Sequence, residues 1–284
     1  MEPVLEVRNL TKIFREEGKE DFTAVDNVSF SLYPGETLGI VGESGSGKST
    51  IAKCMMCLTD VTEGSILLDG REIAGFSAKP GAPGKVPGRH TGMKERRGRR
   101  TDSRKQTARW KEQRDLYRKI QMVFQSPTGS FDPRRTLGYS IAESLKNNRV
   151  SKTEIHRKVD DLMRLCGLDA ELANRYPHQV SGGQCQRAAI ARALAISPKI
   201  LIFDEATSAL DVTVQQEMME FLVQLKEEYQ LSYLFICHNL ALVQNFCDRV
   251  LVMKDGKLVE EGTAHEVILS PKQAYTKLLV ESCL

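Results

Sequence analysis

The chain has 284 residues, of which 41% are hydrophobic and 27% are charged, and its formal net charge is +3. No run of 18 or more apolar residues occurs, which excludes a membrane-spanning helix, and the first residues lack a signal-peptide pattern. We therefore expect a cytosolic chain that reaches a membrane only through a partner.

The first part of the chain predicts β-strands followed by a phosphate-binding turn. Residues 5–32 read as strands with a turn near residues 15–19. The short apolar strand 36–41 leads into Gly42-Glu43-Ser44-Gly45-Ser46-Gly47-Lys48-Ser49, which fits the phosphate-loop pattern G-x-x-x-x-G-K-[ST]. A helix is expected over residues 50–58, so the pattern lies at the strand-to-helix turn that it requires.

The phosphate loop predicts a nucleotide site. Its glycines let the backbone turn N–H groups toward phosphate oxygens, and the start of the next helix adds a positive end. Lys48 is expected to reach the β- and γ-phosphates, and Ser49 to ligate Mg²⁺. The residues expected to contact the nucleotide here are Gly42, Ser44, Gly45, Ser46, Gly47, Lys48, Ser49 and Thr50.

Residues 76–119 form a basic insertion after an expected strand at 64–70. From Lys79 to Lys119 there are 15 Lys or Arg and 4 Asp or Glu, which gives +11 and leaves −8 for the rest of the chain. A Pro- and Gly-rich start predicts a loop, and residues 106–119 predict a helix. We favour a solvated surface insertion, and contact with anionic lipid or nucleic acid stays open.

A helical block follows the expected strand 120–124. Its apolar pattern runs from Leu137 to about Cys166, and Gly167 is expected to end it. A further helix is expected over residues 186–195.

Two adjacent carboxylates follow a buried strand. The apolar run 200–203 is typical of a parallel sheet and ends at Asp204-Glu205. At that edge of the sheet the two carboxylates lie beside the phosphate loop. Asp204 is predicted to hold Mg²⁺, and Glu205 to activate the attacking water. The remaining expected elements are a helix at 212–229 and strands at 231–236, 250–253 and 257–260.

Five motifs occur in the order found in ATP-binding-cassette (ABC) ATPases, and the chain resembles this family from about Leu5 to Leu279. The matches are the adenine-stacking aromatic (Phe14), the Q-loop glutamine (Gln125), the signature (Val180-Ser181-Gly182-Gly183-Gln184, with Val for the usual Leu), the D-loop (Ser208-Ala209-Leu210-Asp211) and the switch histidine (His238).

The resemblance implies a single ABC ATPase domain over residues 1–284. We expect an α/β fold of the P-loop NTPase class, with a RecA-like core, an antiparallel β subdomain and an inserted helical subdomain at 126–190 that carries the signature. ATP and Mg²⁺ are the implied cofactors. The implied roles are catalysis for Glu205, His238 and Gln125, metal contact for Ser49, Gln125 and Asp204, and nucleotide contact for Phe14, Asp211 and, across a head-to-tail dimer, Ser181, Gly183 and Gln184.

Two further segments resemble peptide and nickel importer ATPases. Residues 130–134 resemble their Ser-Leu-Asn-Pro-Arg segment, and residues 275–279 match their Tyr-Thr-Lys-Leu-Leu tail, with Gln-Ala in place of the preceding His-Pro. The resemblance implies peptide or nickel uptake at the cytoplasmic face of the cell membrane. The implied partners are a second ABC ATPase, two transmembrane permeases and an extracytoplasmic substrate-binding protein, and nucleic acid is not expected among them.

One alternative stays open on the motifs alone. The chain could be a non-transport ABC ATPase, namely an assembly factor, an accessory of carbon–phosphorus lyase or a nucleic-acid-associated protein. The basic insertion motivates this alternative, because Lys and Arg clusters bind phosphate backbones.

Overall fold

The computed structural model describes residues 1–283 except for 16–17, 19, 76–112, 149 and 208–210. Most of the expected basic insertion and the first three residues of the expected D-loop therefore lie outside the described residues. Of the helix expected over residues 106–119, the described part, 113–119, is helical and leads directly into a strand. Within the described residues, no helix is both long enough and apolar enough to cross a bilayer.

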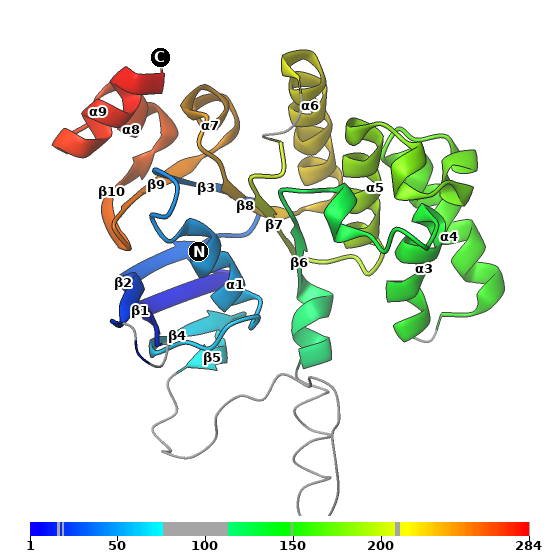
Figure 1. The fold of residues 1–284 in the computed structure, drawn as a ribbon, viewed down its shortest axis with the longest axis horizontal. Coiled ribbons are helices and arrows are strands. Elements are labelled where there is room, and N and C mark those ends of the chain that lie inside the picture. Colours follow the sequence, from blue (N-terminus) through cyan, green and yellow to red (C-terminus); the bar gives the residue numbers. More distant parts are fainter. Residues whose placement is uncertain (16–17, 19, 76–112, 149, 208–210, 284) are drawn as a thin grey trace, which may run out of the picture.

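Six strands form a mixed sheet in the order β10-β9-β3-β8-β7-β6 (Figure 1). All pairings are parallel except that of β10 with β9. Every residue of β3, β7 and β8 is buried, as expected for strands covered on both faces. The strands are β3 (Thr37–Val41), β6 (Ile120–Val123), β7 (Ile200–Asp204), β8 (Ser232–Ile236), β9 (Arg249–Lys254) and β10 (Lys257–Thr263).

A second sheet is antiparallel and has the order β2-β1-β4-β5. Its strands are β1 (Leu5–Phe14), β2 (Phe22–Leu32), β4 (Glu63–Leu68) and β5 (Arg71–Gly75). This sheet is the antiparallel β subdomain expected from the sequence. Helix α1 (Lys48–Met55) lies between it and the large sheet (Figure 1), and both sheets contribute side chains to the core around α1.

Apart from α6, which packs against the middle of the large sheet, the helices named below gather at its two edges. Figure 1 shows α3, α4 and α5 beyond the edge strand β6, and α7, α8 and α9 near β9 and β10. The first group is the expected helical subdomain. The bounds are α3 (Leu137–Asn147), α4 (Lys152–Leu165), α5 (Gly182–Leu194), α6 (Val212–Tyr229), α7 (Leu240–Phe246), α8 (Ala264–Leu269) and α9 (Ala274–Cys283), with short 3-10 turns at Thr128–Ser130, Ala170–Asn174 and Pro177–Gln179.

The helical block expected from Leu137 to Cys166 is two helices. The second one, α4, starts at a new cap, because the Ser151 hydroxyl accepts a hydrogen bond from the Glu154 amide at 3.3 Å. It ends where the sequence predicts, since Gly167 has φ +67°, a conformation that glycine adopts readily.

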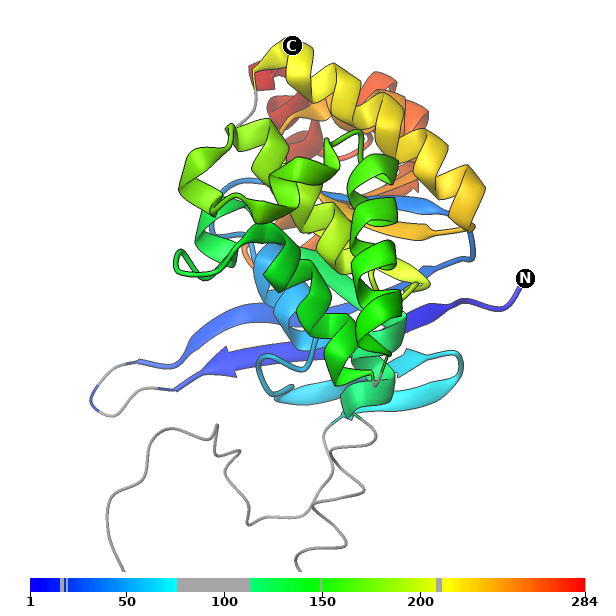
Figure 2. The same cartoon turned by 90° about the vertical axis from the view of Figure 1, so that its right-hand side faces the viewer.

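Side chains of the large sheet alternate between two hydrophobic cores. Leu201 and Phe203 of β7 pack with α5 and α6, whereas Ile200 and Ile202 of the same strand pack with α1. The large sheet therefore separates α1 from α5 and α6, and Figure 2 shows α6 (yellow) above the strands.

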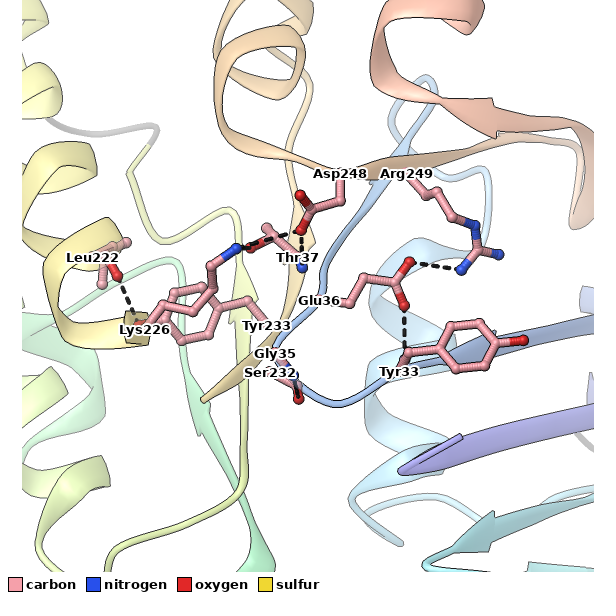
Figure 3. Close-up of polar contacts among 10 residues, drawn as sticks. All are labelled: Tyr33, Gly35, Glu36, Thr37, Leu222, Lys226, Ser232, Tyr233, Asp248 and Arg249. Carbon is pink, nitrogen blue, oxygen red and sulfur yellow. Dashed lines mark hydrogen bonds and ion pairs between the residues drawn. The ribbon is translucent and has the colours of Figure 1, made fainter. Parts of the chain in front are cut away.

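A polar network fixes the start of β3 (Figure 3). The buried carboxylate of Glu36 accepts hydrogen bonds from the Tyr33 amide at 2.7 Å and from Nη1 of Arg249 at 2.6 Å. One residue later, the Thr37 amide donates to Oδ2 of Asp248 at 2.7 Å, and Lys226 Nζ donates to the Thr37 hydroxyl at 3.0 Å. These contacts hold the strand whose other end opens into the phosphate loop.

Candidate active site

The phosphate loop joins β3 to α1 and needs glycine at two positions. Gly42 has φ +146° and a side chain there would meet the Met253 carbonyl oxygen at 2.1 Å, while Gly47 has φ +100° and would meet that of Ala24 at 2.3 Å. Gly47 precedes α1 without a side-chain cap. The first amides of α1 therefore remain available to an anion.

Lys48 lies folded under the phosphate loop. Its side chain is only 4% exposed, and Nζ donates to the carbonyl oxygens of Gly42 at 2.8 Å and Glu43 at 2.7 Å. Burial lowers the pKa of the Lys48 ammonium, and the nearby carboxylates of Glu205 and Asp204 oppose this shift. The site thus holds a positive charge away from water, where it acts strongly on a phosphate.

Ser49 and Asp204 form the oxygen pair that the sequence predicts. The Ser49 hydroxyl donates to Oδ1 of Asp204 at 2.7 Å, and Asp204 ends β7 with 8% of its surface exposed. Burial raises the pKa of Asp204, and the hydrogen bond from Ser49 opposes this shift. A hydroxyl and a carboxylate are hard oxygen ligands, so this donor set fits Mg²⁺.

Glu205 is held by two neighbouring strands. Its φ is +50°, and its amide donates to the Ile236 carbonyl at the end of β8 at 2.9 Å. Its Oε2 accepts a hydrogen bond from Nε2 of Gln125 at 2.8 Å. Gln125 follows β6, the next strand of the sheet, so the two predicted catalytic residues are brought together.

His238 lies just beyond the end of β8 and is exposed. The Cys237 amide donates to the Ile40 carbonyl at 3.2 Å, which ties this segment to the strand before the phosphate loop. The Asn239 side chain accepts from the amides of Ala241 and Leu242 and thereby starts α7. His238 is thus presented at the same edge of the sheet as the carboxylates.

Phe14 lies at the end of β1, in the antiparallel sheet. Its ring is 41% exposed, and Nζ of Lys12 lies 4.8 Å from the ring centroid. An exposed ring with a cation on one face can stack on a flat ligand.

The signature residues start α5 on the far side of the large sheet from the phosphate loop. The Ser181 hydroxyl accepts from the Gln184 amide at 3.2 Å, and the Gln184 side chain accepts from the Ser181 amide at 3.0 Å. Asp211 caps α6 by accepting from the Val214 amide at 3.0 Å. A side chain on Gly183 would lie 3.1 Å from Val214, so the two helix starts are adjacent.

Apart from Phe14, which lies in the antiparallel sheet, the predicted site residues form two groups. One group meets at the edge of the large sheet that carries the phosphate loop, and the other lies at the starts of α5 and α6. Helix α1 packs into a different core from these two helices, and among the described residues no hydrogen bond joins the second group to the phosphate loop of its own chain. The second group is Ser181, Gly183, Gln184 and Asp211.

Two contributors were missed at the sequence level. The phenol oxygen of Tyr275 accepts a hydrogen bond from the amide of Glu43, inside the phosphate loop, at 3.2 Å. Arg192 of α5 donates to the carbonyl and the hydroxyl oxygen of Ser130 at 2.6 and 3.0 Å, which ties the signature helix to the segment after Gln125. The only sequence signal for Arg192 is a charge on the otherwise apolar stretch of α5.

Comparisons with known proteins point to one family. The family model described as ABC transporter matches residues 25–208. An oligopeptide transport ATP-binding protein, OppF of Haemophilus influenzae, is 44% identical over 91% of this chain and 69% of its own length. AppF of Bacillus subtilis, also an oligopeptide transport ATP-binding protein, is 40% identical over 99% of this chain and 78% of its own length.

A third relative and two solved structures agree. The glutathione import ATP-binding protein GsiA of Salmonella choleraesuis is 40% identical over 98% of this chain and 41% of its own length. The cassette MJ0796, solved as a dimer with ADP and phosphate, matches with a TM-score of 0.73, 27% identity and coverage of 92% of this chain and 98% of that one. CbiO1 of Clostridium perfringens, part of an ABC transporter complex, matches with a TM-score of 0.73, 25% identity and coverage of 95% and 92%.

Proposed function

The chain belongs to the ABC transporter family as an importer ATPase, and we propose that its ATP hydrolysis drives the uptake of peptides. The relatives named for oligopeptide transport and for glutathione import support peptides more directly than nickel. The observation that carries the ATPase mechanism is the meeting of Ser49 with Asp204 and of Gln125 with Glu205 at one edge of the sheet.

We propose the following roles for the residues at that edge. The amides of the phosphate loop and of the start of α1 bind the phosphates of ATP, and Lys48 contacts the β- and γ-phosphates. Ser49, Asp204 and the amide oxygen of Gln125 would hold Mg²⁺, which supplies positive charge to the phosphate oxygens when it is bound. Phe14 stacks on adenine.

Glu205 then activates the attacking water. The hydrogen bond from Gln125 leaves its carboxylate oriented toward the sheet edge, where a water can be placed in line with the γ-phosphate. His238, at the end of the neighbouring strand, contacts the γ-phosphate.

A second cassette completes the site. Because Ser181, Gly183 and Gln184 begin a helix that packs into a different core from α1, we propose that they bind the nucleotide of a partner cassette placed head to tail, with Asp211 at the same interface. The cap of Ser181 uses the amide of Gln184, and the amides of Gly182 and Gly183 at the same helix start suit a γ-phosphate. ATP then closes the pair and hydrolysis opens it.

The whole importer that we propose contains this chain, a second ABC ATPase, two transmembrane permeases and an extracytoplasmic substrate-binding protein. The chain then works at the cytoplasmic face of the membrane. Affinity purification of the tagged chain from detergent-solubilised cells tests this composition. Recovery of two multi-span proteins and a second cassette is the expected result, and recovery of only soluble partners would refute import and leave the ATPase assignment standing.

A further inference from the structure

The phosphate loop forms a hydrogen bond with a residue that lies 232 positions away in the sequence. The amide of Glu43, the second residue of the loop, donates to the hydroxyl oxygen of Tyr275 at 3.2 Å. Tyr275 lies in the first turn of α9 and is partly buried, and Nζ of Lys254 lies 4.8 Å from its ring centroid. The ring is therefore held in place independently of its hydroxyl.

The start of α9 is fixed by a buried carboxylate. Glu260 of β10 is 9% exposed and accepts hydrogen bonds from the amides of Lys272 at 2.8 Å and Gln273 at 3.0 Å. These amides immediately precede α9, so Glu260 ties the beginning of this helix to the large sheet. Charge-assisted hydrogen bonds of this kind are among the stronger ones in proteins.

The same part of the chain touches the phosphate loop at two further points. The Gly256 amide donates to the Ser46 carbonyl at 3.2 Å, and Gly42 lies against the Met253 carbonyl. The loop is therefore held from outside by the turn after β9 and by α9.

The two peptide groups of Glu43 connect the hydrogen bond with Tyr275 to the ammonium of Lys48. The Glu43 amide donates to Tyr275, while the Glu43 carbonyl accepts from Nζ of Lys48. A tilt of the backbone at Glu43 would thus move the atom that places the Lys48 ammonium. The hydroxyl of Tyr275 restrains that tilt by accepting the hydrogen bond of the Glu43 amide.

We propose that Tyr275 is a positioning residue for ATP, and that α9 acts as a clamp that keeps the phosphate loop in its binding conformation. This inference rests on the nucleotide site proposed above. The proposal gives α9 a role in ATP binding. Loss of the clamp should weaken ATP binding and leave the chemical step largely intact, because Glu205 and Gln125 follow other strands, β7 and β6.

The test is the variant Tyr275→Phe, which removes one hydroxyl and keeps the contact between the aromatic ring and the Lys254 ammonium. One neutral hydrogen bond corresponds to roughly a 2- to 10-fold change in an equilibrium constant. The Kd for ATP with Mg²⁺ and the KM should both rise within that range, while kcat stays within about twofold. Amide hydrogen exchange over residues 42–47 should become faster in the nucleotide-free variant.

Tyr233→Phe is the matched control. The Tyr233 hydroxyl also bonds a backbone group, the Leu222 carbonyl at 3.0 Å, but it lies in the core between β8 and α6. Its loss should lower the melting temperature and leave ATP affinity unchanged.

Two outcomes for Tyr275→Phe would refute the clamp. The first is that ATP affinity and hydrogen exchange of the loop are both unchanged. The second is that melting temperature and kcat fall while ATP affinity does not change. Failure of the wild type to bind ATP would instead refute the nucleotide site, and loop exchange would then decide the clamp by itself.

Discussion

The side-chain amide of Gln125 donates to the carboxylate of Glu205 at 2.8 Å, across the ends of the parallel strands β6 and β7. Gln125 also opens the segment that runs into α3 of the helical subdomain, and Arg192 of α5 anchors that segment at Ser130. The carboxylate that we assign to water activation is therefore connected through Gln125 to the helices beyond the edge strand β6. A rotation of those helices would change the partner of Glu205.

The first prediction concerns Gln125→Ala. The variant removes both the hydrogen-bond partner of Glu205 and one proposed Mg²⁺ ligand, so ATP turnover should fall by about 10-fold or more. ATP affinity measured without Mg²⁺ should be unchanged, because no hydrogen bond among the described residues joins Gln125 to the phosphate loop. Steady-state kinetics and calorimetry measure the two quantities.

Gln121→Ala is the control for that prediction. Gln121 lies on β6, four residues before Gln125, and its side-chain amide donates to the carbonyl oxygens of Tyr117 and Ile120. Loss of a glutamine at this position should leave turnover intact. Equal turnover in the two variants would mean that the contact with Glu205 has no role in hydrolysis.

The second prediction is that Asp204→Asn stabilises the nucleotide-free protein while it abolishes Mg²⁺-dependent turnover. Burial raises the pKa of Asp204, so its charged form is poorly accommodated in the fold, and Asn keeps an acceptor for Ser49. The melting temperature at pH 7 should rise by about 1–3 °C.

The pH dependence of this difference in melting temperature follows from the upward shift of the Asp204 pKa. A carboxyl group whose pKa is raised on folding contributes its full stability below the ordinary carboxyl pKa of about 4, and loses it as pH rises through the raised value. The gap in melting temperature between Asp204→Asn and the wild type should therefore close as pH falls toward about 4. A wild type that is the more stable of the two at pH 7 would contradict the assignment.

The third prediction separates capping from nucleotide binding at Ser181. Ser181→Ala removes the cap of α5 and should cost about 1 kcal/mol of stability. If Ser181 also binds the partner's nucleotide, ATP-dependent association of the two cassettes should be lost as well. Analytical ultracentrifugation with ATP and the Glu205→Gln background detects that association.

Thr263→Ala is the matched control, because Thr263 caps α8 through an equivalent box with Glu266. It should cost a similar amount of stability and leave association unchanged. Equal association in both alanine variants would remove Ser181 from the interface.

The local parts of the nucleotide site could be predicted because each motif lies within one strand and its following turn. The glycines of the phosphate loop and the residues Asp204 and Glu205 were assigned from such local patterns, and β3, α1 and β7 lie where the patterns place them, with bounds shifted by a few residues. The contacts of Ser49 with Asp204 and of Gln125 with Glu205 follow from the parallel order of the strands.

Contacts between distant segments could not be predicted in the same way. Tyr275 served at the sequence level only as a marker of resemblance, because no periodicity relates it to Glu43. The split of the helical block at Ser151 was missed although the sequence carries a signal for it: Ser151 is followed three residues later by Glu154, a pattern typical of a helix start. The antiparallel pairing of β1 with β4 joins segments that are distant in the sequence, and short sequence patterns do not encode such pairings.

The most direct test of the account is single-turnover ATP hydrolysis by Glu205→Gln, assembled with the partner subunits that co-purify with the wild type. We predict retained ATP binding and a hydrolysis rate reduced by about 100-fold or more, with Glu227→Gln on the exposed end of α6 as an active control. Hydrolysis at the wild-type rate by Glu205→Gln would contradict the assignment of Glu205 as the residue that activates water.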